Sequence, residues 1–163
     1  MQAFRYVGPA AIRDAVADQP AGHALGSPAA RIAWWNAQGR GDAEQVFTYV
    51  VGTDGVLRVA SRRSEHVACA GGGDVLAAGE LGFERDGRTV ALVTNQSTGY
   101  CPRVDCWPAI AAALDAVDAI RPPVWTAAFE FRRCDTCDER TIVKDDWFEC
   151  PLCGGELPRE WNF

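Results

Sequence analysis

Four cysteines near the end of the chain have the spacing of a metal site. They form two Cys-x2-Cys pairs, Cys134 with Cys137 and Cys150 with Cys153, and twelve residues separate the pairs. Each pair can form a short turn that directs two thiolates to one point, which gives the tetrahedral four-sulfur site that zinc favours. Four sulfur ligands leave no position for a water molecule, so the spacing predicts one structural, non-catalytic zinc ion per chain.

This part of the chain, residues 131–163, resembles the zinc ribbons, and its second cysteine turn is similar to those of rubredoxins. That turn, residues 150–155, has the sequence Cys-Pro-Leu-Cys-Gly-Gly, in which the glycine after the last thiolate permits a positive φ. The first turn has Asp138 at the same place, and aspartate adopts the left-handed region less readily. The resemblance implies that all four cysteines ligate the metal. The gap between the pairs is shorter than in rubredoxins, which favours zinc over an iron electron-transfer centre.

The other three cysteines give a weaker signal. Cys101 and Cys106 flank Pro102, and they could form a redox pair or, with His66, a second metal half-site. We favour the alternative in which both are small apolar side chains at the entry to a helix. Cys69 is expected to lie in the core.

A second group of polar residues lies between Arg62 and Pro102. Within it, His66, Glu80 and Tyr100 could serve as base, acid and hydrogen-bond donor in a cleft. The side chains that could bind an anionic or polar ligand beside them are Arg62, Arg63, Ser97 and Thr98. A structural role for the whole group is favoured, because residues 97–102 have the composition of a turn after a strand.

The same region loosely resembles domains of bacterial toxin and conflict-system proteins. Those domains have a histidine after a strand hairpin, a G-x-V-x-A-A-G-E-like strand and an S-G-H-Y-x-P turn before a helix. The matching positions here are His66, residues 73–80 and residues 97–102. The last segment is Ser-Thr-Gly-Tyr-Cys-Pro, so the second histidine of the pattern is absent. The resemblance implies a fold and a bacterial context, and it implies no particular activity.

The elements that must position these residues follow from hydrophobic spacing and turn signals. Helices are expected over 9–18, 28–38 and 108–120, where apolar residues recur at helical intervals. Strands are expected over 46–51, 56–60, 79–85, 88–94 and 124–131, with Asp-Gly turns inside two hairpins. This order predicts an α+β fold with a largely antiparallel sheet and about three helices. We expect two domains, an α+β domain over 1–130 and a zinc ribbon over 131–163 docked on it.

Composition and charge exclude several classes of protein. Of the 163 residues 48% are hydrophobic and 23% are charged, as in ordinary globular proteins, and no apolar run is long enough to span a bilayer. The first residues lack the pattern of a secretory signal, so a cytoplasmic protein is expected. A net charge of −6 opposes nucleic-acid binding, which needs a concentrated basic face.

These observations favour a zinc-binding protein that binds a partner protein or a small ligand, within a bacterial conflict or regulatory system. The alternative is an enzyme that acts on a nucleotide-like or glycosidic substrate through His66, Glu80 and Tyr100. Nucleic-acid binding through the zinc ribbon ranks third, because acidic residues outnumber basic ones there by eight to five. The basic residues near the loop of the ribbon are Arg132, Arg133, Arg140 and Lys144.

Overall fold

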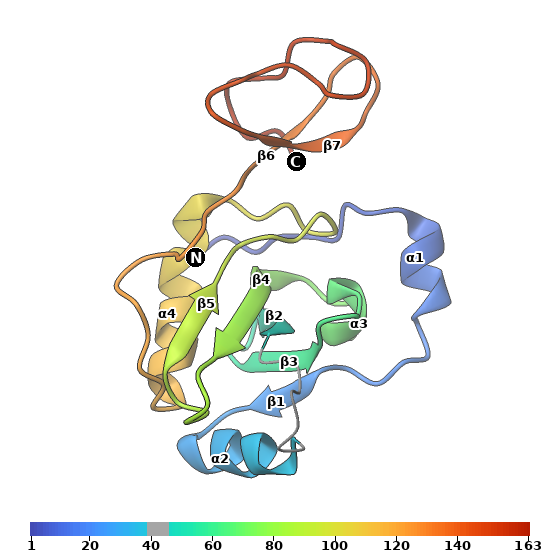
Figure 1. Cartoon of the computed structure of the whole chain (residues 1–163). Helices are drawn as coiled ribbons and strands as arrows, with labels where there is room; N and C mark the ends of the chain where they lie inside the picture. Colours follow the sequence, from blue (N-terminus) through green and yellow to red (C-terminus); the bar gives the residue numbers. More distant parts are fainter. Residues whose placement is uncertain (39–45) are drawn as a thin grey trace.

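The computed structural model describes residues 1–38 and 46–163. A five-stranded antiparallel sheet occupies the middle of the molecule, and a two-stranded hairpin near the C-terminus lies beyond one end of it (Figure 1). Four α-helices and one 3-10 helix complete the described part of the chain. The predicted α+β class with a largely antiparallel sheet is confirmed.

The five-stranded sheet has the order β1-β3-β2-β4-β5. Its strands are β1 (His23–Leu25), β2 (Val46–Gly52), β3 (Leu57–Ser61), β4 (Val75–Phe83) and β5 (Val90–Val93). The predicted hairpin between β2 and β3 is confirmed, and Gly55 in its turn has a φ of 78°. β4 begins four residues before its predicted start, because β2 offers partners along its whole length and pairs its Gly52 with Val75.

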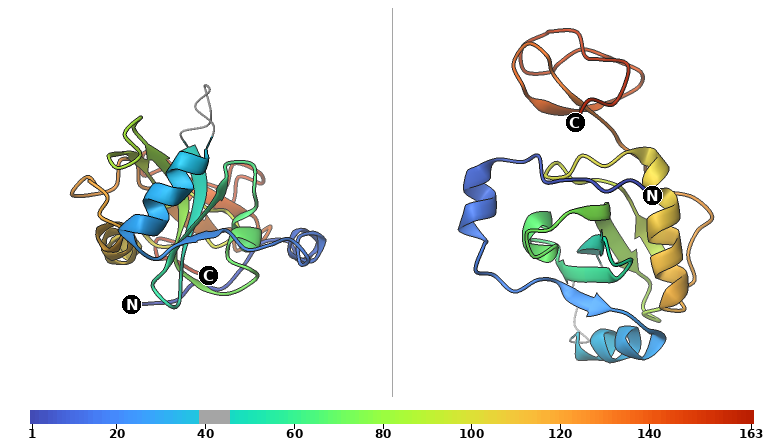
Figure 2. Two further views of the ribbon diagram at one scale, coloured as in Figure 1. Left: turned by 90° about the horizontal axis from the view of Figure 1, so that it is seen from below. Right: turned by 180° about the vertical axis from the view of Figure 1, so that it is seen from behind.

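The α-helices lie around the sheet (Figure 2). They are α1 (Ala10–Ala15), α2 (Pro28–Ala37), α3 (His66–Cys69) and α4 (Trp107–Ala116). α4 and α3 lie on opposite sides of the strands, and α4 buries Ile110 and Leu114 completely. Trp34 of α2 packs against Phe47 of β2, with 4.8 Å between ring centres. These contacts join the helices and the sheet into one hydrophobic core.

Two expected helices are shorter than predicted, and α2 agrees with its prediction. α2 begins after Ser27, whose hydroxyl accepts a hydrogen bond from the N–H of Ala30 at 3.2 Å. α4 ends at Ala116 and not at residue 120, because Asp118 takes a positive φ of 56° and so breaks the helical conformation. α1 covers only six residues of the expected segment 9–18.

The strand predicted over 124–131 is wrong for most of its length. Only β6 (Glu130–Arg133) is a strand there, and it pairs with β7 (Arg140–Val143). The residues before β6 run along the edge of β5, where Thr94 and Ala127 form an isolated bridge. The Asn95 carboxamide then holds the chain, because it accepts from the Phe129 N–H at 2.7 Å and donates to the Phe129 carbonyl at 2.8 Å. This clamp directs β6 away from the main sheet.

Residues 130–163, called the C-terminal segment below, contact the rest of the chain near their C-terminal end and through β7. Trp161 donates its indole N–H to the carbonyl of Cys101 at 2.8 Å and packs edge-on against Phe4. Arg140 in β7 donates to the carbonyl of Thr98 at 3.0 Å. The division into two domains at residue 130 stays a prediction. Among the described residues, no helix is long and apolar enough to cross a membrane.

Candidate metal centre

The four predicted cysteines converge on one point in the C-terminal segment. Their Sγ atoms all lie within 4.8 Å of one another. The Sγ atoms of Cys134 and Cys153 are 3.6 Å apart, and those of Cys137 and Cys150 are 3.7 Å apart. Zn–S bonds of about 2.3 Å in a tetrahedral site require sulfur–sulfur distances of roughly 3.8 Å. The four-cysteine cluster therefore has the dimensions of a site that could hold a metal ion.

Two turns of the same construction present these sulfur atoms, one at residues 134–139 and one at 150–155. In each turn the first cysteine donates its N–H to the carbonyl five residues later, at 2.8 Å. Its own carbonyl accepts from the N–H four residues later, at 2.9 Å. The two halves of the site are thus built alike, although they share little sequence outside the cysteines.

The residue after the second cysteine of each turn has a positive φ, 63° at Asp138 and 72° at Gly154. Asp138 thus adopts the left-handed conformation, which is less favourable for aspartate than for glycine. Arg133 donates to the Asp138 carboxylate at 3.0 Å, which fixes this side chain across the turn.

Electrostatics favour the thiolate at Cys134 and oppose it at two other members of the cluster. Against backbone hydrogen bonds that act the other way, burial and hydrogen bonds with neighbouring sulfur atoms raise the pKa of Cys137 and Cys153. Hydrogen bonds from the backbone N–H groups of Cys137 and Thr136 lower the pKa of Cys134 to about 6. A thiol with this pKa is mostly ionised at neutral pH, and the thiolate is the form that ligates metals. The peptide backbone of the first turn therefore prepares one of the four ligands.

The apolar packing around the four-cysteine cluster is small. Cys134, Cys150 and Leu157 are its buried members, and Val143 and Phe148 pack against them half-buried. So few buried side chains supply little hydrophobic stabilisation. A metal ion bound by the four cysteines would add stability that this small apolar cluster does not supply.

Three of the residues singled out in the middle of the chain meet beside β4. His66 begins α3, and its Nε2 lies 3.0 Å from the carbonyl oxygen of Gly79. Arg62 Nε lies 3.1 Å from the Glu80 carboxylate, so these two form an ion pair. Burial lowers the pKa of His66, against weaker opposing effects of the Gly79 carbonyl and Glu80. The structure thus brings a buried histidine, whose pKa is lowered, close to an ion pair at one place on the sheet.

The hydroxyl of Tyr100 is bound to the backbone before β4. Its hydroxyl donates to the carbonyl of Gly73 at 2.6 Å, its ring is fully buried, and burial raises its pKa far above the usual value. Within the described part of the chain, no hydrogen bond joins it to His66 or Glu80. The catalytic role of these three residues stays a prediction.

The four predicted ligand-binding side chains differ in exposure and in their partners. Arg62 is engaged by Glu80, and the side chains of Arg63 and Thr98 are exposed. Ser97 is buried, and its hydroxyl has no hydrogen-bond partner in the structure. The structure does not join these four into one group by hydrogen bonds or ion pairs, and their binding role also stays a prediction.

The other three cysteines are buried single side chains. Burial raises the pKa of Cys69, Cys101 and Cys106 to about 12 in each case. Thiols of this kind stay protonated and unreactive at neutral pH. Among the described residues, the four-cysteine cluster is the only group of three or more potential ligands close enough to share an ion. A half-site made of Cys101, Cys106 and His66 is therefore not formed.

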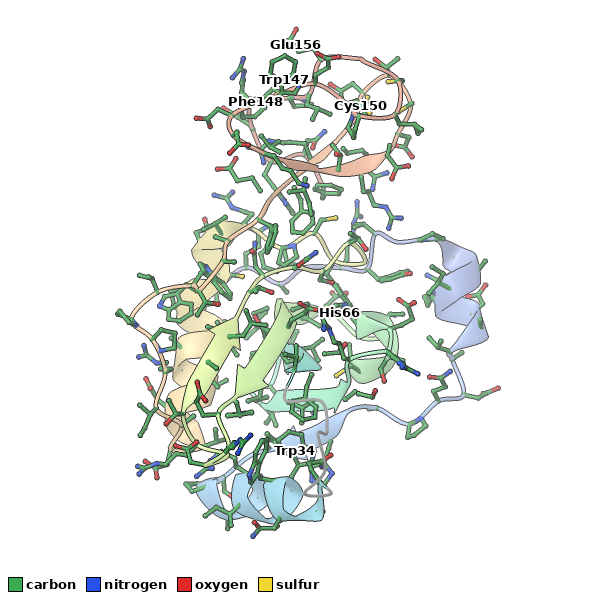
Figure 3. The ribbon with its side chains drawn as sticks, viewed as in Figure 1. Trp34, His66, Trp147, Phe148, Cys150 and Glu156 are labelled. Atoms are coloured by element: carbon green, nitrogen blue, oxygen red, sulfur yellow. The ribbon has the colours of Figure 1, made fainter. Side chains whose placement is uncertain are left out.

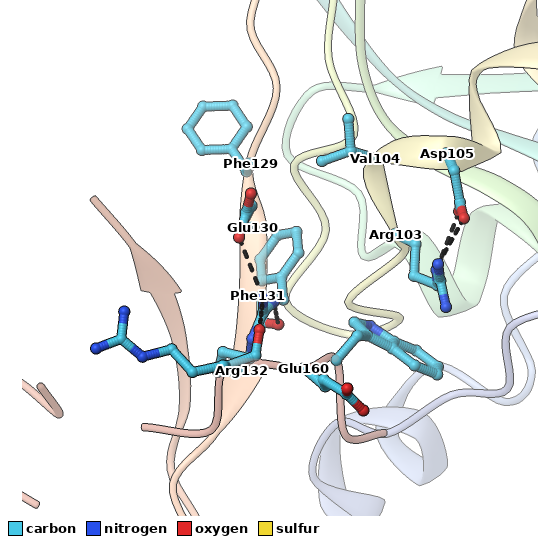
Figure 4. Close-up of a pocket in the computed structure, with 10 residues that line it drawn as sticks. Arg103, Val104, Asp105, Phe129, Glu130, Phe131, Arg132 and Glu160 are labelled. Atoms are coloured by element: carbon cyan, nitrogen blue, oxygen red, sulfur yellow. Dashed lines mark hydrogen bonds and ion pairs between the residues drawn. The ribbon is translucent and has the colours of Figure 1, made fainter. Parts of the chain in front are cut away.

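A cleft of about 410 Å³ lies where the C-terminal segment meets the rest of the chain (Figure 4). Four of its six charged side chains form ion pairs, since Arg103 lies 2.7 Å from Asp105 and Arg132 lies 3.1 Å from Glu130. Trp161 forms part of its wall. Neither His66 nor Glu80 lines the cleft.

No family model, no curated protein and no solved structure matches this chain. The resemblance to bacterial toxin and conflict-system domains has no support from a family match, and it stays a prediction. The candidate metal site is therefore supported by geometry alone, chiefly by the convergence of the four cysteines.

Proposed function

We propose that the protein is an interaction module in which a structural zinc ion holds the C-terminal segment in the shape that a partner protein binds. Four thiolates suit zinc and close its coordination sphere, so the ion would have no open position for a substrate. Zinc sites of this kind supply roughly 10–16 kcal/mol of apparent binding free energy at neutral pH. That is enough to fold a segment with so small a core.

One observation carries the proposal: a large aromatic side chain is exposed on this small, cross-linked segment. Trp147 is 66% exposed, and it lies at the end of the C-terminal segment farthest from the five-stranded sheet (Figure 3). Leu152, between the cysteines of the second turn, is 69% exposed. Exposed tryptophans held on a rigid frame are typical of the residues that dominate binding to other proteins.

The rival functions have less support. Catalysis would need His66, Glu80 and Tyr100 to face one cleft, and the hydroxyl of Tyr100 is bound to a different part of the chain. Nucleic-acid binding would need free basic side chains, and Arg132 is bound to backbone carbonyls within its own segment. A location in the cytoplasm suits the proposal, because its reducing conditions keep thiols available for the metal.

The experiment immobilises three forms of the protein and compares the proteins that each form retains from an extract of the cells that produce it. The forms are the wild type, Trp147→Ala, and Ile32→Ala, which removes a 49% exposed side chain from α2 as a control. We expect a stoichiometric partner protein on the wild type and on Ile32→Ala, and at least about tenfold less of it on Trp147→Ala. Equal retention by Trp147→Ala, or no partner on the wild type, would reject the proposed function.

A further inference from the structure

The four cysteines of the cluster differ in how easily solvent reaches them. Cys134 and Cys150 are buried, with 1% exposure each, and Cys137 is half-buried. Cys153 is exposed, and its neighbour in the same turn, Leu152, is exposed as well. A dissolved reagent therefore reaches Cys153 more easily than the other three.

A sulfur atom that ligates a metal is also a reactive group. Metal binding requires loss of the thiol proton, so the four cysteines of a loaded site are thiolates. Susceptibility to oxidation follows thiolate character and exposure together. Cys69, Cys101 and Cys106 have neither property, because burial shields them and keeps them protonated. Cys153 is the cysteine that combines both properties when the site is loaded.

A second sulfur atom lies next to that of Cys153. The Sγ atoms of Cys134 and Cys153 are 3.6 Å apart, although the two cysteines belong to different turns. A disulfide has an S–S bond of about 2.05 Å, so a movement of roughly 1.5 Å would bring these atoms to bonding distance. Cys137 and Cys150 form a similar pair at 3.7 Å, but neither of them is exposed.

We propose that Cys153 is an oxidation site, at which a hydroperoxide converts the metal site into a Cys134–Cys153 disulfide. The thiolate of Cys153 attacks one peroxide oxygen, the O–O bond breaks, and hydroxide or alkoxide leaves. The thiolate of Cys134 then attacks the sulfur of the resulting Cys153 sulfenic acid, and a second hydroxide leaves. Both leaving groups take up protons from water. The two thiolates together lose two electrons, and the peroxide gains them.

The disulfide leaves only the thiolates of Cys137 and Cys150 as ligands, and two sulfur atoms do not close a tetrahedral site. The C-terminal segment then loses the stability that the metal supplies, and with it the shape of the proposed binding surface. A reducing thiol restores both ligands by exchange with the disulfide, so the change is reversible. This inference rests on the proposed function and adds its regulation.

The test follows zinc release from the metal-loaded protein with a colorimetric zinc indicator after addition of hydrogen peroxide. The test variant is Cys153→His, and the matched control is Cys150→His. Each variant keeps four ligands of kinds that zinc accepts, and each lacks one sulfur atom, at the exposed or at a buried position. Native mass spectrometry establishes the zinc content of each form before oxidation.

We expect the wild type and Cys150→His to release zinc at similar rates, and Cys153→His to release it at least about tenfold more slowly. Digestion of the oxidised wild type without reduction, followed by mass spectrometry, should show Cys134 bonded to Cys153. Dithiothreitol with added zinc should restore the loaded form. The digestion decides the question by itself if a histidine variant does not hold zinc.

The inference is overturned if the two variants release zinc equally fast, or if the disulfide of the oxidised wild type does not include Cys153. A loaded wild type that resists peroxide would overturn this inference alone. An untreated wild type without zinc would overturn the proposed function as well, so the two failures are distinguishable.

Discussion

At the scale of single residues, Gly79 connects the polar residues in the middle of the chain to the packing of the sheet. Its carbonyl oxygen lies 3.0 Å from Nε2 of His66. A Cβ atom at this position would overlap the carbonyl oxygen of Thr94. The hydroxyl of Tyr49 donates to that same oxygen at 2.8 Å. Neighbouring backbone thus approaches so closely that only glycine fits.

This close approach predicts a large effect for Gly79→Ala. The added methyl group must push the backbone at Thr94 away from β4, which we expect to lower the free energy of unfolding by about 3 kcal/mol. Gly26→Ala is the control, because a Cβ atom at Gly26 meets nothing within 4 Å. It should change stability by less than about 0.5 kcal/mol. Urea unfolding measures both, and equal stability of the two variants would contradict the packing described here.

At the scale of elements, the turn between Lys144 and Trp147 has an unfavourable sequence for its shape. Asp145 and Asp146 have φ values of 51° and 56°, and the N–H of Trp147 donates to the carbonyl of Lys144 at 2.9 Å. Two central residues with positive φ define a type I′ turn, for which Asn-Gly is the preferred sequence. The chain keeps two carboxylates there at some cost in stability.

Replacement of both residues, Asp145→Asn with Asp146→Gly, should therefore stabilise the turn. We expect the free energy of unfolding of the metal-loaded protein to rise by about 1 kcal/mol, because both new residues tolerate positive φ. Denaturant unfolding followed by tryptophan fluorescence measures this effect. Unchanged or lower stability would contradict the assignment of the turn.

The elements also show what could be predicted from the sequence. α2 and the β2–β3 hairpin carry strong local signals, a serine–proline start and an Asp-Gly turn, and both are confirmed. β1 and α3 were not predicted, because segments of three and four residues are too short to show a periodicity. The segment 124–129 is rich in apolar residues, yet contacts with the edge of β5 and the Asn95 clamp decide its conformation. Such contacts between distant residues leave no local pattern.

The same distinction between local signals and long-range contacts applies to the candidate site. The convergence of the four cysteines followed from their spacing, since each Cys-x2-Cys pair forms its own turn. The contact of His66 with the Gly79 carbonyl, and that of the Tyr100 hydroxyl with the Gly73 carbonyl, depend on strand register and on long-range packing.

At the scale of the whole molecule, the chain combines two sources of stability. The five-stranded sheet and its helices share one large hydrophobic core, whereas the four-cysteine cluster of the C-terminal segment has only Leu157 as a buried apolar neighbour. Trp161 and Arg140 attach this segment to the rest of the chain. In the proposed function, the shape of the binding surface therefore depends on a metal ion.

Native mass spectrometry of the untagged protein, before and after treatment with a strong chelator, tests that central claim most directly. We predict one zinc ion per wild-type chain, its loss to the chelator, and much weaker retention in Cys153→Ser, which removes one ligand. Cys69→Ser is the control, because Cys69 lies outside the cluster, and it should keep one zinc ion per chain. A wild-type chain without metal, or a Cys153→Ser variant that holds zinc as firmly as the wild type, would contradict the account.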